Sequence, residues 1–286
     1  MAEAVSLRVD WPRLVLYSAM LAPLLIILLF FFVVPLGIVA GNSLTGTGVD
    51  AAFPSLSQYT SILTDSYYLG ILWRTVVVGL AATLGALVLG YPAALVLFFF
   101  QGRWRQVFLF VIISPLFISV IVRTYGWMVL LGPGGLPSLL PSEIRPRLIK
   151  TEFAIMVGLA HIYIPYMVLS INSAMSRIDV RYLRAAATLR ASNYQIFRDI
   201  ILPLSAPGVV AGCAIVFSLS MTSFSTPILL GGSGNKTMPY LIYQQNLVVG
   251  DWATGSALAI VLLAVTMSVL VTLTLLSRRV MTRVGG

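Results

Sequence analysis

Residues 75–102 read TVVVGLAATLGALVLGYPAALVLFFFQG, a run of 28 residues that contains no Asp, Glu, Lys or Arg. A helix needs about 20 apolar residues to cross a bilayer, so this run is long enough to span a membrane. The same holds for four more uncharged stretches and for a fifth that Arg123 alone interrupts: 14–49, 153–176, 200–235, 252–277 and 106–142. The sequence therefore predicts an all-α, polytopic membrane protein.

The composition excludes the common classes of soluble protein. The 286 residues are 59% hydrophobic and only 9% charged, with a mean hydropathy of +0.97, whereas soluble domains carry about 25% charged residues. A soluble Rossmann enzyme, a DNA-binding domain and a secreted disulfide scaffold are ruled out. Cys213 is the only cysteine and His161 the only histidine, so a disulfide within the chain and a His-rich metal cluster are excluded. Both are expected to pack within the bundle, where His161 could hydrogen-bond across helices.

Six spans are predicted, and the basic residues orient them. The approximate cores are 14–39, 72–100, 107–131, 153–175, 207–230 and 254–276. With the N-terminus inside, the inner segments hold 12 Lys and Arg residues and the outer segments hold 4, in agreement with the positive-inside rule. Both termini are therefore expected in the cytoplasm, and the net charge of +9 reflects orientation rather than nucleic-acid binding. The chain then divides into a cytoplasmic lead (1–13), a transmembrane domain (14–276) and a cytoplasmic tail (277–286).

The inner segment after the fourth core is predicted to form a helix, a turn and a second helix. Asp179 is a suitable N-cap for a helix over about 180–189. Ser192 and Gln195 form a capping box for a second helix that ends at Pro203. The first helix carries three adjacent alanines flanked by arginines, which suits close docking of a cytoplasmic protein. An amphipathic helix that lies on lipid headgroups is the alternative.

The same segment carries a spaced motif. It reads Arg184-Ala185-Ala186, then Leu189-Arg190-Ala191-Ser192, then Ile200-Ile201-Leu202-Pro203. This order resembles the EAA loop of permease subunits of bacterial ATP-binding-cassette (ABC) importers, in which Glu-Ala-Ala is followed by a Gly and later by Ile-x-Leu-Pro. Two positions depart from that pattern, because the usual Glu is Arg184 and the usual Gly is Arg190. A non-Gly residue at the turn costs about 1 kcal/mol if the turn needs a positive φ.

The resemblance covers most of the chain from about residue 55 onward and is closest to permeases of the spermidine/putrescine type. Its other motifs are Ser114-Pro115 with Arg123-Thr124-Tyr125-Gly126-Trp127, Tyr163-Ile164-Pro165-Tyr166-Met167-Val168, Ser223-Phe224-Ser225-Thr226-Pro227 with Leu230-Gly231-Gly232, and Asp251-Trp252 with Gly255-Ser256-Ala257. It implies the six-helix fold of a type I ABC importer permease, with residues 179–203 as the coupling element. Contacts to the ATPase are then expected from Arg184, Ala185, Ala186, Leu189, Arg190, Ala191 and Ser192.

The resemblance also implies the rest of the transport machine. The chain would pair with a second, different permease in the bacterial inner membrane, receive its solute from an external binding protein and be driven by a dimer of cytoplasmic ATPases. It contains no Gly-x-x-x-x-Gly-Lys-[Ser/Thr] phosphate loop. It is therefore expected to be no enzyme and to bind no cofactor itself, with ATP and Mg²⁺ held by the partner. The expected solute is a polyamine. The alternative is another small solute, such as an opine or amino-acid-like compound, ferric ion or an oxyanion.

Seven residues are candidates for the translocation path. Arg123 is a charge at membrane depth, which is costly and usually faces a cavity or a partner, although it could instead snorkel to headgroups. It would suit the carboxylate of an amino-acid-like solute. A hydroxylated run ends at Pro227, where the fifth span is expected to break, and broken helices are tolerated along a cavity. The candidates are Arg123, Trp127, Tyr163, Tyr166, Ser223, Ser225 and Thr226, with ordinary helix packing as the alternative.

Two competing classes of function fit the sequence less well. A stand-alone secondary transporter or channel predicts inverted repeats and an acidic residue within a span. The sequence has no visible repeat, and every Asp and Glu lies outside the six cores. An intramembrane enzyme is disfavoured because a lone His and a lone Cys in different spans do not make a catalytic dyad.

Overall fold

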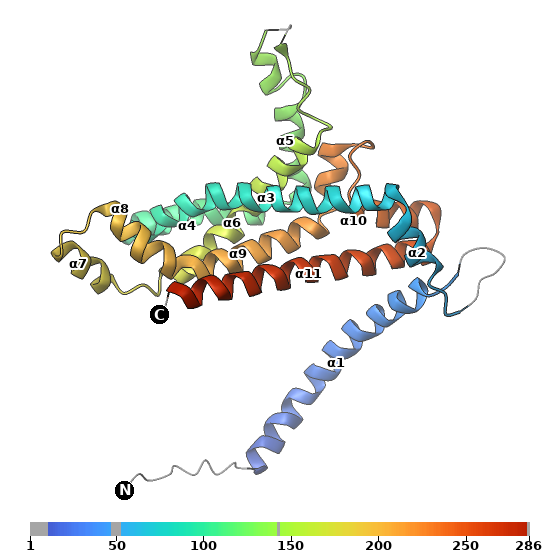
Figure 1. Cartoon of the computed structure of the whole chain (residues 1–286), viewed down its shortest axis with the longest axis horizontal. Helices are drawn as coiled ribbons and strands as arrows, with labels where there is room; N and C mark the ends of the chain where they lie inside the picture. The colour runs from blue at the N-terminus through green and yellow to red at the C-terminus, as the bar shows by residue number, and fades with distance from the viewer. Residues whose placement is uncertain (1–10, 47–52, 142–143, 285–286) are drawn as a thin grey trace.

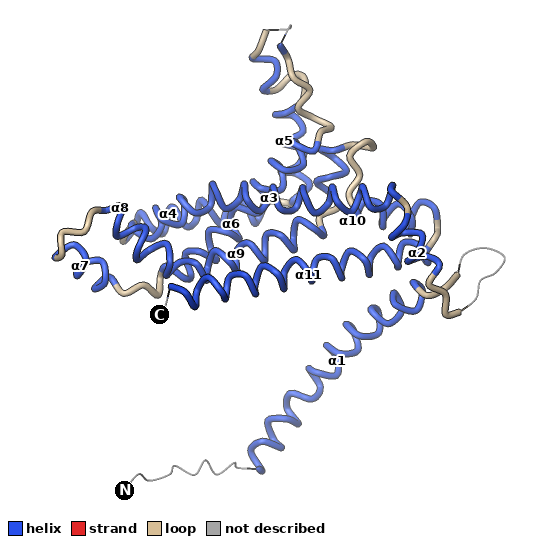
Figure 2. The backbone as a smooth tube through the Cα atoms, in the orientation of Figure 1, coloured by secondary structure: helices blue, strands red, loops and turns tan. Residues whose placement is uncertain are grey.

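The computed structural model describes residues 11–46, 53–141 and 144–284, and this part of the chain consists of helices and loops without a β-strand (Figure 2). The α-helices are α1 (Trp11–Ser43), α2 (Ser57–Thr64), α3 (Ser66–Phe99), α4 (Gly102–Ile113), α5 (Val120–Leu131), α6 (Glu152–Met175), α7 (Val180–Thr188), α8 (Asn193–Ile196), α9 (Leu202–Thr222), α10 (Met238–Tyr243) and α11 (Trp252–Val284). The 3₁₀ turns are η1 (Ser114–Phe117) and η2 (Leu136–Leu139), and the π-helical turns are η4 (Phe197–Ile201), η5 (Pro227–Gly231) and η6 (Gln244–Val249). The all-α prediction is confirmed.

Among the described residues, five helices are long and apolar enough to cross a membrane, and the number rises to six if one bent pair of helices is counted as a span. Five of the six predicted spans thus have a single-helix counterpart, and the predicted span 107–131 corresponds to the bent pair. Residues 1–10 of the predicted lead lie outside the described residues. The predicted tail does not begin a new element, because α11 continues from the last span as far as Val284.

The predicted span 107–131 is not one straight helix. Its two parts, α4 with η1 and α5 with η2, are bent by 95° at a short break. Pro115 has no N–H to donate to the Val111 carbonyl, so the α-helix tightens into the 3₁₀ turn η1. Ile118 and Ser119 are then extended, with ψ of 133° and 137°. As a result α5 leaves the membrane bundle in a new direction (Figure 1).

The fifth span breaks four residues earlier than predicted. α9 ends at Thr222, and Ser223 is extended with a ψ of 125° before the chain turns back into η5. The break expected at Pro227 is wrong, because a proline in the first turn of a helix removes an N–H that has no partner there anyway. The Lys150 N–H donates to the Leu230 carbonyl at 2.8 Å and so ties η5 to the loop before α6.

The second predicted helix of the inner segment does not end at Pro203. α8, η4 and α9 form one continuous helix of 30 residues that begins at Asn193. In η4 the Leu202 N–H bonds to the Phe197 carbonyl, five residues back. This wider turn accommodates Pro203 in the first turn of α9. The predicted element 179–203 therefore merges with the following span.

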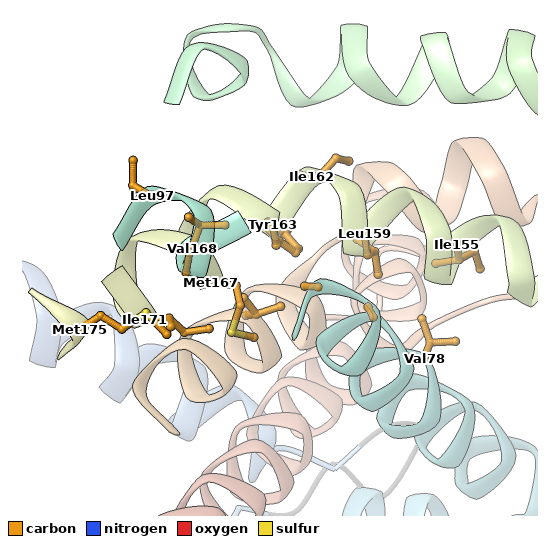
Figure 3. Close-up of a cluster of buried hydrophobic side chains, with 14 of the residues drawn as sticks. Val78, Leu97, Ile155, Leu159, Ile162, Tyr163, Met167, Val168, Ile171 and Met175 are labelled. Atoms are coloured by element: carbon orange, nitrogen blue, oxygen red, sulfur yellow. The ribbon is translucent and has the colours of Figure 1, made fainter. Parts of the chain in front are cut away.

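The centre of the molecule is α6, which packs against α3 and α9. Met167 and Ile171 are fully buried and point from α6 towards α9 (Figure 3). Helices in a membrane associate through close packing, which small residues permit. A Cβ placed on Gly208 of α9 would lie only 2.7 Å from the Ser170 carbonyl oxygen of α6. The glycine therefore lets the two backbones come into contact.

The helices α3, α6, α9 and α11 run side by side and form the bundle (Figure 1). α7 and α8 lie at one end of it, close to the end of α11, and α2 and α10 lie at the opposite end. There the Arg74 guanidinium on α3 and the Glu152 carboxylate on α6 form an ion pair of 2.6 Å. α1 diverges from the bundle, and its most apolar window of 18 residues is 0% buried within the chain. Such a surface requires lipid or another membrane helix around it.

Candidate functional site

The first part of the candidate site is α7 and α8 at one end of the bundle (Figure 1). Asp179 caps α7, because its Oδ1 accepts a hydrogen bond from the Arg181 N–H at 2.8 Å. At the start of α8, the Gln195 N–H donates to Ser192 Oγ at 3.3 Å and the Ser192 N–H donates to Gln195 Oε1 at 2.7 Å. This is a complete capping box. Both predicted helix starts are confirmed.

The turn between α7 and α8 is a Schellman motif with Arg190 at the position after the C-cap. The Ala191 N–H donates to the Ala186 carbonyl at 3.1 Å, and the Arg190 N–H donates to the Ala187 carbonyl at 3.0 Å. This pair of bonds requires a left-handed residue between the helices, and Arg190 has a φ of +60°. The turn therefore meets the condition stated for the motif, and the arginine costs about 1 kcal/mol relative to the more usual glycine.

Most of the predicted ATPase-contacting residues lie on the surface of this end. The Leu189 side chain, at the end of α7, is 84% exposed. Arg184, Ala185, Arg190 and Ser192 are also exposed, whereas Ala186 and Ala191 are half-buried. Three apolar side chains fix the element to the core cluster of the bundle: Leu183, Ile196 and Phe197. The exposed surface therefore presents Leu189 as its most exposed apolar side chain, close to the arginines Arg184 and Arg190.

Replacing Arg190 with Gly is expected to stabilise the turn by about 1 kcal/mol, because glycine adopts a positive φ without steric cost. Hydrogen exchange of the α7 amides in the purified protein should then slow by a factor of about five. The matched control is Arg184→Gly, also an exposed arginine but in the interior of α7. That change should destabilise the helix by about 1 kcal/mol and speed exchange. Equal effects of the two changes would contradict the assignment of strain to Arg190.

Tyr91 of α3 connects this end to the membrane spans. Its hydroxyl lies 2.9 Å from Ser205 Oγ of α9, and its ring packs edge-on against Phe197 with the centroids 6.1 Å apart. Phe197 is the first residue of the π-turn η4, and Ser205 lies in the first turn of α9, just after Pro203. The Tyr91 side chain of α3 therefore contacts the helix both before and after the junction of η4 with α9.

The second part of the candidate site lies between α5 and α6. Arg123 Nη1 donates to the Ile162 carbonyl at 3.1 Å. Trp127 Nε1 donates to His161 Nδ1 at 3.1 Å, and the two rings pack edge-on. His161 is exposed in the single chain rather than packed within the bundle as predicted, but the predicted hydrogen bond across helices is present.

Three more of the predicted path residues meet beside Arg123. The Tyr163 hydroxyl donates to the Leu219 carbonyl at 3.1 Å and also interacts with the Ser223 side chain. The rings of Tyr163 and Tyr166 pack edge-on at 6.1 Å, and both phenols lie close enough to Arg123 to interact with its charge. The structure thus gathers five of the seven candidates: Arg123, Trp127, Tyr163, Tyr166 and Ser223.

The remaining two candidates lie apart from this cluster. Thr226 is fully buried, and its Oγ1 lies 3.2 Å from the Thr124 hydroxyl of α5. It therefore holds α5 against the chain that follows the break in span five. Ser225 is half-buried and makes no hydrogen bond to the cluster within the described residues. Sequence reasoning misses Thr124, because its partner lies 102 residues away and no local pattern marks the pair.

The cluster can bind and orient a solute but is poorly equipped for covalent chemistry. It combines one guanidinium with phenol, indole, imidazole and hydroxyl groups, and no carboxylate of the described residues lies in it. Aromatic faces attract cations, and hydroxyl groups donate and accept hydrogen bonds. In the described part of the chain, no group of three His, Cys, Asp or Glu residues could hold a metal ion.

Proteins with similar sequences are membrane transport subunits. Residues 86–282 match the family described as "Binding-protein-dependent transport system inner membrane component". The spermidine/putrescine transport system permease protein PotB of Haemophilus influenzae is 32% identical over 241 residues, which cover 82% of this chain and 84% of that protein. PotB of Escherichia coli K12 is 35% identical over 245 residues, which cover 82% and 88%. The putative 2-aminoethylphosphonate transport system permease protein PhnU of Salmonella paratyphi A is 25% identical, with coverages of 85% and 84%.

Two solved transporters contain a chain of the same fold. In a bacterial alginate ABC transporter in complex with its pentasaccharide-bound periplasmic protein, that chain superposes with a TM-score of 0.78 at 18% identity, with 95% of this chain and 97% of that chain covered. In the inward-facing MetNI methionine ABC transporter the TM-score is 0.56 at 16% identity, with coverages of 77% and 99%. At these identities the likeness concerns the arrangement of helices and carries no information about the solute.

Proposed function

The chain belongs to the family of binding-protein-dependent transport system inner membrane components, and on that premise we propose that it imports polyamines as one of two permease subunits of an ATP-driven transporter. Membership of the family makes it a multi-pass transport permease of the bacterial inner membrane, not an enzyme. Beyond family membership, the proposal specifies the orientation of the chain in the membrane, its partner proteins and its solute.

The observation that carries the proposal is the exposed α7–α8 end. It lies at the same end of the bundle as the end of α11 (Figure 1), and five arginines fall between residues 177 and 198. A cytoplasmic location of the α7–α8 end agrees with the positive-inside rule, and with this orientation both termini lie in the cytoplasm. A dimer of cytoplasmic ATPases docks on this end, with Leu189 and the neighbouring arginines in contact. ATP and Mg²⁺ are bound by those partners, and this chain supplies no ligand to them.

The proposed mechanism is alternating access. Closure of the ATPase dimer displaces α7 and α8. The displacement passes to α9 through the continuous helix that begins at Asn193, and to α3 through Tyr91. The cluster around Tyr163 and Tyr166 then faces the opposite side of the membrane. An external binding protein delivers the solute to a path that this chain and a second permease line together.

A polyamine is the solute supported best. Relatives such as the PotB proteins of Haemophilus influenzae and Escherichia coli, which are more than 30% identical over four fifths of this chain, are spermidine/putrescine permeases. The half-buried Trp127 and the exposed Tyr166 suit a solute with several ammonium groups, because aromatic faces attract cations without a formal charge. The proposed path residues are the seven predicted ones, five of which meet in the cluster.

The test has two parts. The protein is purified in mild detergent from native membranes, the co-purifying chains are identified by mass spectrometry, and ATPase activity is assayed. Uptake of radiolabelled putrescine and spermidine is measured in cells. We expect an ATPase and a second permease of similar size, and ATP-dependent uptake of at least one polyamine. The polyamine assignment would be rejected if unlabelled glutamate or 2-aminoethylphosphonate inhibited uptake and unlabelled polyamines did not. Repeated recovery of a lone chain without ATPase would reject the importer.

A further inference from the structure

Arg123 contacts α6 well inside the length of that helix. Its Nη1 bonds to the carbonyl of Ile162, which is ten residues beyond the first residue of α6. A helix rises 1.5 Å per residue, so this carbonyl lies about 15 Å from one end of a helix that is about 36 Å long. The hydrocarbon core is about 30 Å thick. Snorkelling serves arginines close to the headgroups, and a contact this far from either end of α6 disfavours the headgroup alternative for Arg123.

The chain itself leaves the Arg123 cation without a counter-ion. A guanidinium has five N–H donors, and the hydrogen bond from Arg123 goes to a neutral carbonyl. Its Nε is buried and has no acceptor within the described residues. Every Asp and Glu of the chain lies outside the six cores. Within the described part of this chain, Arg123 therefore lacks a counter-ion and an acceptor for its Nε–H.

The local backbone also favours an anion next to Arg123. The residue lies in the first turn of α5, whose N-terminus carries the positive end of the helix dipole. A charged arginine at the bilayer centre costs about 2.5–3.5 kcal/mol on insertion scales. A carboxylate offsets that cost best, because it accepts two parallel N–H bonds from the guanidinium.

The direction of α5 shows where such a carboxylate can come from. α5 projects away from the bundle (Figure 1), and its side chains at Ile121, Val122 and Val129 are 50%, 61% and 72% exposed. Arg123 is half-exposed at the edge of this apolar face. A neighbouring membrane helix from another subunit would cover the apolar face and reach the guanidinium from the same side. A polyamine carries no carboxylate and cannot fill this role.

We infer that Arg123 forms an intramembrane salt bridge with an Asp or Glu on a membrane span of the second permease subunit. The inference rests on the proposed function, since it needs a heteromeric importer. It assigns Arg123 to the part of the path where the two permease subunits meet, as a positioning residue that does not contact the solute.

The test starts from the intact wild-type complex. Its co-purification with the second permease and its polyamine uptake are measured first. If either is absent, the proposed function fails before the inference about Arg123 is tested. Arg123→Glu puts two carboxylates together and should reduce the recovered second permease by at least about tenfold, since breaking a buried ion pair costs several kcal/mol. Arg123→Lys should retain part of the complex. The matched control is Arg145→Glu, an exposed arginine in the loop beyond α5, which should leave recovery unchanged.

A suppressor selection makes the result specific to charge. Cells that carry Arg123→Glu and depend on polyamine uptake should regain growth through an Asp or Glu replaced by Lys or Arg within a span of the second permease. Full recovery of the second permease with Arg123→Glu would overturn the inference. So would loss of uptake with the complex intact, which would mean that Arg123 contacts an anionic group of the solute.

Discussion

Replacement of Leu189 with Asp is expected to abolish polyamine uptake and to release the ATPase from the purified complex. The side chain is 84% exposed at the end of α7 and carries no packing role within the chain. Burial of a leucine at an interface is worth about 1.5–3 kcal/mol, and a carboxylate left unpaired there adds a desolvation cost. Together these terms should weaken ATPase binding at least about 100-fold. The measurement is the ratio of ATPase to permease after purification, with uptake in parallel.

Leu139→Asp is the matched control for this change. Leu139 is also a leucine and is 80% exposed, but it lies in η2, the turn that follows α5. The same substitution there should leave the bound ATPase unchanged. If Leu189→Asp retains the ATPase to the same extent as the control, the docking role of α7 is wrong.

Replacement of Gly208 with Val is expected to destabilise the whole permease. A Cβ at this position would lie 2.7 Å from both the Ser170 carbonyl oxygen and the Ala174 Cβ, and 3.0 Å from the Ile171 Cα. A backbone cannot give way as a flexible side chain does, so α6 and α9 must separate. Overpacking of this kind costs about 1–3 kcal/mol, which corresponds to a fall of about 3–10 °C in the unfolding temperature. The measurement is thermal unfolding of the purified complex by fluorescence-detected size exclusion.

Gly70→Val provides the control for helix propensity. Gly70 is within α3, and a Cβ added there would meet no atom within 4 Å. The same replacement should shift the unfolding temperature by less than about 2 °C. Similar shifts for both variants would show that loss of glycine itself, rather than the contact of α6 with α9, determines the effect.

The sequence alone determined the features that depend on neighbouring residues. Long uncharged runs must be spanning helices, because lipid offers no partner for charges or open backbone groups. Asp179 and Ser192 had to start helices, since their side chains bond to N–H groups two or three residues away. Each of these features is a local property of the chain.

The tertiary structure alone decided where span five breaks and which side chains meet. Span five breaks at Ser223 rather than at Pro227, and the Lys150 N–H of the loop before α6 bonds to the Leu230 carbonyl beyond the break. The contacts of Arg123 with Ile162 and of Thr124 with Thr226 join residues 39 and 102 positions apart. No periodicity encodes such pairs, because they depend on how whole helices pack. The sequence therefore identified the spans and the caps, and packing between helices decided the shape of the path.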